Sequence, residues 1–277
     1  MKKQIVVWLT VVLALMLAAC GNGVKENETT APEGGAATET TDAATEPQGE
    51  TLTLRVVDGA GTGRFTLAGA DAGAVYTASA DELTVYLDDK PATPADLQNG
   101  MRLTVQPGYE LLETWPAQFA GATVYAESPE TAKDDCGDLC GLYLTVLENL
   151  WENDAALNEE ITYISVDLAE APGGMTAGEQ AAVAWVFAGK HGAQPLTYSF
   201  EALKENGFVN EAELYWPEGV LFSITATENA KQTDKKILFD AEKWRSGTGA
   251  IFFNECTAKR GKGPAWENYE PGGFVIS

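Results

Sequence analysis

The first fifty residues restrict which part of this chain can fold. Lys2 and Lys3 precede an apolar run of 15 residues, Ile5–Ala19, and Cys20 follows the run. A basic start, an apolar middle and small residues before a cleavage point are the layout of a secretory signal. The run is also shorter than the ~20 residues that a helix needs to span a bilayer. We therefore predict that residues 1–19 are a signal peptide, which leaves the fold to the residues after it.

Cys20 stands at the predicted cleavage point. Leu17-Ala18-Ala19-Cys20 resembles the lipobox of bacterial lipoproteins, in which the cysteine thiol is acylated and the peptide is cut just before it. The resemblance implies a lipidated N-terminal Cys20 that anchors the chain in the cell membrane, on the extracytoplasmic face. Two or more acyl chains give a firm anchor, because each buried CH₂ contributes ~0.8 kcal/mol. A plain secretory signal or an uncleaved anchor is the alternative.

Residues 20–50 have the composition of an acidic linker. They contain Thr, Ala, Glu, Gly and Pro and almost no large apolar side chain, so they bury too little surface to offset chain entropy. We predict that this linker is disordered. The chain has a formal net charge of −23, and none of the blocks 20–50, 51–128 and 129–277 is basic. Nucleic-acid binding requires Lys and Arg to displace phosphate counterions, so the charge argues against it.

Residues 51–128 alternate apolar and polar side chains over short segments, which predicts strands separated by turns. The Gly59–Gly63 segment resembles a phosphate loop in composition, but a strand pattern follows it rather than a helix, so we interpret it as a hairpin loop. A short helical turn is predicted at Thr93–Leu97, with Pro94 in its first position. The predicted strands are Thr51–Val57, Arg64–Leu67, Val75–Ala78, Leu83–Leu87, Met101–Val105, Tyr109–Thr114 and Thr123–Ala126.

Two segments of this region carry a family resemblance. Gly100–Val105 and Leu112–Gln118 look like the end of a small OB-like β-barrel domain that recurs in secreted lipoproteins of Gram-positive (Firmicutes) bacteria. The resemblance implies an all-β barrel, and it gives no activity to carry over to this chain. Pro116 lacks an amide donor and would end the strand. Trp115 would then pack at the mouth of the barrel, or contact a ligand there.

Residues 129–277 predict an α+β domain, with helices packed on an antiparallel sheet. Apolar residues at helical spacing follow Leu139, a capping box opens a helix at Thr176 that stops at Gly192, and Ser199 caps a short helix. We also predict that the apolar tail pairs beside the Ala250–Thr257 strand. The remaining predicted strands are Ile161–Leu168, Glu213–Trp216, Val220–Ala226, Lys236–Glu242 and Gly273–Ser277.

The histidine and the cysteines give little support for nucleophilic or thiol-redox catalysis. His191, the one histidine of the chain, is predicted at a helix C-terminus, where it caps. Cys136 and Cys140 are spaced differently from a Cys-x-x-Cys redox pair. A Cys136–Cys140 bridge, a bridge from either to Cys256, and free thiols all stay open.

Acidic residues are too numerous to identify a site from the sequence. Asp134, Asp135 and Asp138 precede a predicted helix, whose N-terminus they would stabilise without any ligand. Their spacing is not that of a calcium loop, and we predict no metal or cofactor. Paired catalytic carboxylates would need geometry that the sequence does not give.

One basic and aromatic segment, Lys243–Gly249, stands out in the acidic second domain. It is typical of a hairpin with a core Trp. Trp and Arg are also enriched at binding hot spots, so Trp244 and Arg245 join Trp115 as candidate binding residues. The resulting hypothesis is a lipid-anchored, extracytoplasmic, non-enzymatic binding or sensing protein. An envelope hydrolase with paired carboxylates is the alternative, and a thiol-redox lipoprotein a third.

Overall fold

The computed structural model describes residues 51–108, 111–132, 137–261, 263 and 265–277, all within one compact unit that spans residues 47–277. The predicted signal peptide at 1–19, Cys20 and the predicted linker at 20–50 lie outside the described residues, as do Asp134, Asp135 and Cys136. In the described ranges, no helix has both the length and the apolar character required to cross a membrane.

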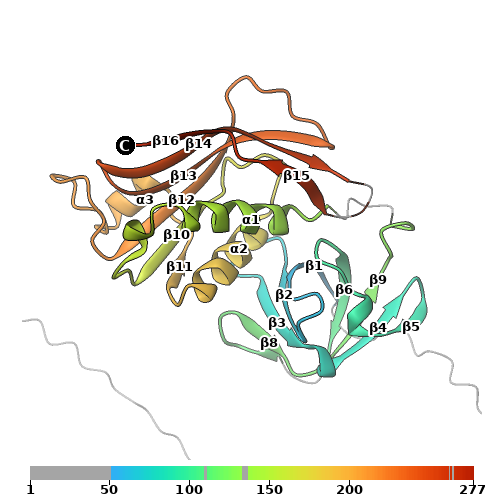
Figure 1. The fold of residues 1–277 in the computed structure, drawn as a ribbon. Coiled ribbons are helices and arrows are strands. Elements are labelled where there is room, and N and C mark those ends of the chain that lie inside the picture. Colours follow the sequence, from blue (N-terminus) through green and yellow to red (C-terminus); the bar gives the residue numbers. More distant parts are fainter. Residues whose placement is uncertain (1–50, 109–110, 133–136, 262, 264) are drawn as a thin grey trace, which may run out of the picture. The chain divides into compact units, whose positions relative to one another are not determined.

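The first region is a nine-stranded sheet (Figure 1). Its strands pair in the order β5-β4-β9-β6-β1-β2-β3-β8-β7. Among the described residues, no pairing joins β5 to β7, so the sheet is not seen as the closed barrel that the resemblance implies. The strands are β1 (Leu52–Asp58), β2 (Arg64–Ala68), β3 (Val75–Ser79), β4 (Leu83–Leu87), β5 (Lys90–Ala92), β6 (Arg102–Pro107), β7 (Leu111–Leu112), β8 (Ala117–Phe119) and β9 (Ala122–Ala126).

The β1–β2 hairpin of this sheet depends on a glycine in its turn. Gly59 has φ +106°, and a Cβ there would lie 2.0 Å from the carbonyl oxygen of Arg64, so only glycine fits the β1–β2 hairpin. The predicted hairpin loop is confirmed. The predicted helical turn is present as a 3₁₀ helix, Pro94–Asp96, with Thr93 as its N-cap.

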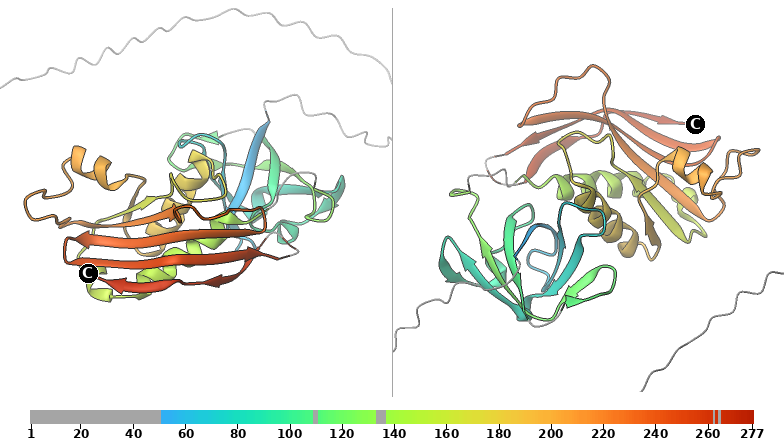
Figure 2. Two further views of the ribbon diagram at one scale, coloured as in Figure 1. Left: turned by 90° about the horizontal axis from the view of Figure 1, so that it is seen from above. Right: turned by 180° about the vertical axis from the view of Figure 1, so that it is seen from behind.

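The second region is a seven-stranded sheet with three helices (Figures 1 and 2). Its strands pair in the order β11-β10-β12-β13-β14-β15, and β16 also pairs with β14. The strands are β10 (Tyr163–Asp167), β11 (Gln194–Leu196), β12 (Gly219–Ala226), β13 (Lys236–Ser246), β14 (Gly249–Arg260), β15 (Trp266–Glu270) and β16 (Gly273–Ile276). The helices are α1 (Leu139–Glu152), α2 (Ala177–Lys190) and α3 (Phe200–Glu205).

The second sheet differs from the prediction in three respects. It contains two strands that were not predicted, β11 and β15. It is mixed rather than antiparallel, because β10 runs parallel to both β11 and β12. The predicted strand at Glu213–Trp216 was wrong. Tyr215 forms only isolated bridges, with Asn210 and Ser246, and Leu214 has a positive φ of 48° that a continuous strand does not adopt.

The helices α1 and α2 lie on one face of the second sheet (Figure 1). The residues of α1 at helical spacing are buried as predicted: Leu142, Tyr143, Val146, Leu147 and Leu150. Burying an aliphatic or aromatic side chain of this size contributes ~1.5–3 kcal/mol, so this apolar stripe fixes the helix on the sheet.

The N-terminus of α2 is seated on the turn between β2 and β3. The Thr176 hydroxyl donates to the carbonyl of Gly69 over 2.8 Å, and the amide of Gly178 donates to the carbonyl of Ala70 over 3.2 Å. A Cβ at Gly178 would lie 2.4 Å from the carbonyl oxygen of Gly69, so the helix approaches the turn as closely as glycine permits.

An ion pair also joins the N-terminus of α2 to the first sheet. The Arg55 guanidinium of β1 pairs with the buried carboxylate of Glu179, and it also donates to the carbonyl of Gly100 over 2.8 Å. The two sheets divide on either side of the predicted boundary at 128/129. Independent folding of residues 51–128 and 129–277 stays a prediction.

The C-terminal tail pairs as predicted. Phe274 lies opposite Phe253 of β14, and Ile276 lies opposite Ile251. The tail is less buried than expected, however, because Phe274, Val275 and Ile276 are 51%, 47% and 59% exposed.

Candidate functional site

Trp244 and Arg245 lie in the interior of the second region. Trp244 is 9% exposed and its ring meets the Phe200 ring of α3 edge-on at 4.8 Å. Arg245 is 8% exposed. Neither side chain forms a surface that a partner could contact, so the binding role predicted for these two residues is not supported. The structure agrees with the alternative interpretation, in which Trp244 is a core residue.

The cations of this segment hold backbone carbonyls. The Arg245 guanidinium donates to the carbonyls of Leu157, Glu159 and Pro217 over 3.1, 2.7 and 2.9 Å. Lys243 is fully buried, and its ammonium donates to the carbonyl of Asn153 over 2.7 Å, just past the end of α1. Burial lowers the pKa of Lys243 to about 8. These donors fix the segment that follows α1.

Trp115 differs from both, because it reaches solvent. It lies in the loop between β7 and β8, and 49% of it is exposed. Its ring meets the Trp185 ring of α2 edge-on, with the centroids 5.4 Å apart. The loop is held locally, because the Thr114 hydroxyl donates to the carbonyl of Pro116 over 2.7 Å. A large aromatic side chain is thus fixed in place with half of its surface uncovered.

Trp115 forms one wall of a cavity of about 210 Å³. Small side chains of α2, Ala181 and Ala184, leave the space open on one side. The segment from Pro195 to Tyr198, which begins in β11, lines another side. We call Trp115 and these lining residues the Trp115 pocket. Its lining is apolar and aromatic with a few polar groups, as in ligand sites, and its volume is below the ~300 Å³ at which such sites usually begin.

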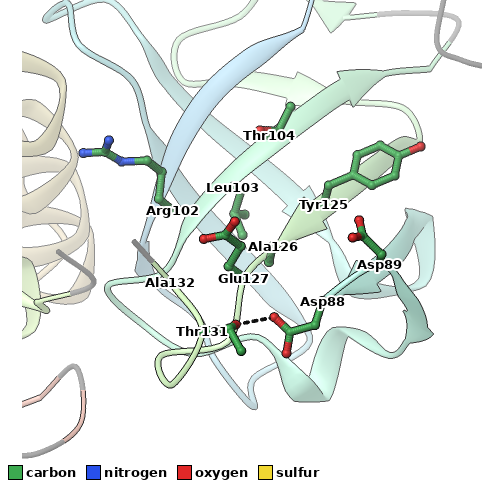
Figure 3. A pocket seen from close by; sticks show the side chains of 10 residues that line it. All are labelled: Asp88, Asp89, Arg102, Leu103, Thr104, Tyr125, Ala126, Glu127, Thr131 and Ala132. Atoms are coloured by element: carbon green, nitrogen blue, oxygen red, sulfur yellow. Dashed lines mark hydrogen bonds between the residues drawn. The ribbon is translucent and has the colours of Figure 1, made fainter. Parts of the chain in front are cut away.

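A second concavity, of about 500 Å³, lies on the first sheet (Figure 3). Asp88 lines this concavity, and its carboxylate accepts hydrogen bonds from the Thr131 hydroxyl and from the amide of Ser128. These hydrogen bonds lower the pKa of Asp88. The lining residues are Asp88, Asp89, Arg102, Leu103, Thr104, Tyr125, Ala126, Glu127, Thr131 and Ala132.

Asp88 is poorly suited to act as an acid catalyst in this cleft. A carboxylic acid that donates a proton near neutral pH needs a raised pKa, and the shift of Asp88 has the opposite sign. In Figure 3 the Arg102 side chain points away from Asp88 and Asp89, so it does not complete a charged constellation with them. The side chains of this cleft give it a solvated, acidic lining.

His191 has a structural role. It is the C-cap residue of α2, as predicted. Its ring stacks on Trp151 at 3.8 Å, and its Nε2 lies 3.3 Å from a carboxylate oxygen of Glu148. Burial lowers its pKa, which opposes the cationic form that the helix C-terminus favours.

The cysteines that the structure describes are free thiols. Cys140 on α1 and Cys256 on β14 are both buried, and burial raises the pKa of each thiol. Reactive thiols need a lowered pKa and access to solvent. Cys136 lies outside the described residues, so the redox alternative rests on no described thiol.

Asp138 caps α1, as its position predicts. Its carboxylate accepts from the amide of Gly141 over 2.8 Å. Burial nevertheless raises its pKa to about 6. Within the described ranges, no three His, Cys, Asp or Glu side chains gather as metal ligands.

Comparisons with models of protein families, with curated proteins and with solved structures each gave no match. The geometry of the site is therefore the basis for any functional assignment.

Proposed function

We propose that this chain is a lipid-anchored, extracytoplasmic binding or sensing protein without catalytic activity. The sequence Leu17-Ala18-Ala19-Cys20 after an apolar run supports the anchor, and the acidic composition of residues 20–50 supports a flexible tether. We also propose that the first sheet derives from an OB-like barrel of Gram-positive lipoproteins, on the strength of the Leu112–Gln118 resemblance.

The Trp115 pocket is the observation that carries the binding proposal. Half of a large aromatic surface is left uncovered at the wall of a cavity, where the Trp185 ring meets it edge-on. Aromatic side chains contribute much of the energy of binding sites, because they bury a large area at a small entropic cost. The ligand would present an apolar ring or side chain to Trp115.

Lipid anchoring is tested by metabolic labelling with a palmitate analogue in a bacterial host. The wild-type chain should incorporate label and sediment with membranes, whereas Cys20→Ala should remain unlabelled. Equal labelling of both proteins would contradict the anchor.

The binding site is tested by site-specific crosslinking in the same cells. A photoreactive benzoylphenylalanine at Thr197, an exposed residue of the Trp115 pocket, should capture an envelope component. Capture should be lost when Trp115→Ala is added, and it should not occur from Glu205, an exposed residue at the end of α3. Capture that persists without the Trp115 ring would contradict the assignment.

A further inference from the structure

The outer edge of the second sheet is formed by β16. It pairs with β14, and no other strand among the described residues pairs with it. The amide of Ser277 donates to the carbonyl of Ala250, directly opposite, over 3.0 Å. Hydrogen-bonded pairs alternate along an antiparallel ladder. Val275 therefore shares the orientation of Ser277, and the backbone N–H and C=O of Phe274 and Ile276 point away from β14.

The side chains of this edge are apolar and half exposed. Phe274, Val275 and Ile276 are 51%, 47% and 59% exposed. Natural proteins protect exposed edges with Lys, Pro or a bulge, because a bare edge recruits further strands. None of these devices stands in Gly273–Ile276. Phe274 lies 5.6 Å from Phe253 between ring centroids, so an added strand would extend an existing apolar surface.

Charge indicates which kind of strand would be added. Both β15 and β16 pair with β14, and they form one edge along it (Figure 1). From Trp266 to Ser277 this edge carries Glu267 and Glu270 and no Lys or Arg. Lys259 faces Glu267 across the ladder, which leaves Glu270 without a basic residue opposite. A second copy would bring like charges together, in a chain of net charge −23.

We propose that β16 accepts an extended apolar segment that carries Lys or Arg, from another polypeptide, as an additional strand. In such β-augmentation, main-chain hydrogen bonds supply affinity and alternate side chains supply specificity. The outward groups of Phe274 and Ile276 would supply the hydrogen bonds. Glu270 would favour the basic residues.

The test uses the mature chain, purified without residues 1–19, and a fluorescent peptide of alternating Val and Lys. Ile276→Pro removes an outward N–H but none of the hydrogen bonds to β14, and edge strands tolerate Pro in this orientation. It should weaken binding about tenfold or more. The matched control Ile276→Thr keeps the N–H and the β-branched shape, and should bind within about threefold of wild type.

Two further measurements use the wild-type protein, so they hold even if Ile276→Pro disturbs the fold. A peptide methylated on every backbone nitrogen cannot donate to the sheet, and should not bind the wild-type protein. A peptide with Glu in place of Lys should bind about tenfold more weakly. Amide resonances of Phe274 and Ile276 should shift when the Val-Lys peptide is added.

The proposal is overturned if the Val-Lys peptide fails to bind at about 1 mM, or binds equally with and without methylation. It is also overturned if sedimentation shows a dimer that Ile276→Pro dissociates, because the edge would then serve a second copy.

Discussion

The Lys243–Arg245 segment and the Trp115 loop both combine tryptophan with features of binding sites, yet they lie in opposite environments. Trp244 is 9% exposed, whereas Trp115 is 49% exposed. The first lies in β13 between paired strands, and the second lies in a loop where the Trp185 ring meets its ring edge-on. Residue type alone therefore does not identify a binding residue. Its place in the sheet decides whether its surface is already used by the fold.

The largest expected difference concerns Arg245. Arg245→Ala leaves the carbonyls of Leu157, Glu159 and Pro217 without their donor inside the protein. We expect the free energy of unfolding to fall by about 3–5 kcal/mol, since several charge-assisted hydrogen bonds are lost and buried acceptors stay unsatisfied. Urea denaturation followed by circular dichroism measures this loss. A loss below about 1 kcal/mol would return Arg245 to the surface candidates.

A second prediction uses the titration of Asp138. Its pKa is raised to about 6, so the folded protein holds this proton more tightly than the unfolded chain. The stability that this proton contributes is complete below pH ~4 and is lost as the pH rises through about 6. The loss should be on the order of 2 kcal/mol.

Asp138→Asn is the matched control for this titration. Asn keeps an oxygen that accepts from the helix amide, but it does not ionise. Denaturation between pH 4 and pH 7 should therefore show a slope for wild type relative to Asp138→Asn. Parallel curves would contradict a raised pKa for Asp138 in the folded protein.

The third prediction concerns the helix that lines the Trp115 pocket. Gly178→Ala places a Cβ 2.4 Å from the carbonyl oxygen of Gly69 and should destabilise the protein by about 1–3 kcal/mol. Gly189 lies in the same helix, and the position that a Cβ would take there is open. Gly189→Ala should therefore stabilise by about 0.5–1 kcal/mol. Thermal melting distinguishes the two, and equal effects would mean that α2 is not seated on the β2–β3 turn.

Much of the fold could be predicted because its signals are local. Alternation predicted most strands of the first sheet, although it missed the short strands β5 and β8. The Thr176 capping box predicted the start of α2. The parallel pairing of β10 with β11 and β12 was missed, because it joins segments far apart in the chain. Glu213–Trp216 was misread as a strand because its residue types suit one.

The candidate site was predicted less well. The sequence marked Trp115, but it gave no signal for the alanines of α2 that complete the pocket. The sequence also could not show that backbone carbonyls of the segment after α1 accept hydrogen bonds from the buried Lys243 and Arg245 side chains. Both facts depend on which distant segments meet.

The smallest expected loss of stability is that of Trp115→Ala, and it tests the contrast with Arg245 most directly. Trp115→Ala should cost only about 1 kcal/mol of stability, because half of the ring is already in water. A double-mutant cycle with Trp185→Ala should give a coupling of about 0.5–1.5 kcal/mol, the usual value for an edge-on aromatic pair. The same substitution should abolish crosslinking from Thr197. A residue that contributes little to folding while being required for capture is one that the fold holds in place for a ligand. If Trp115→Ala instead destabilised the protein as much as Arg245→Ala, the ring would be part of the core, and the contrast between the two regions would disappear.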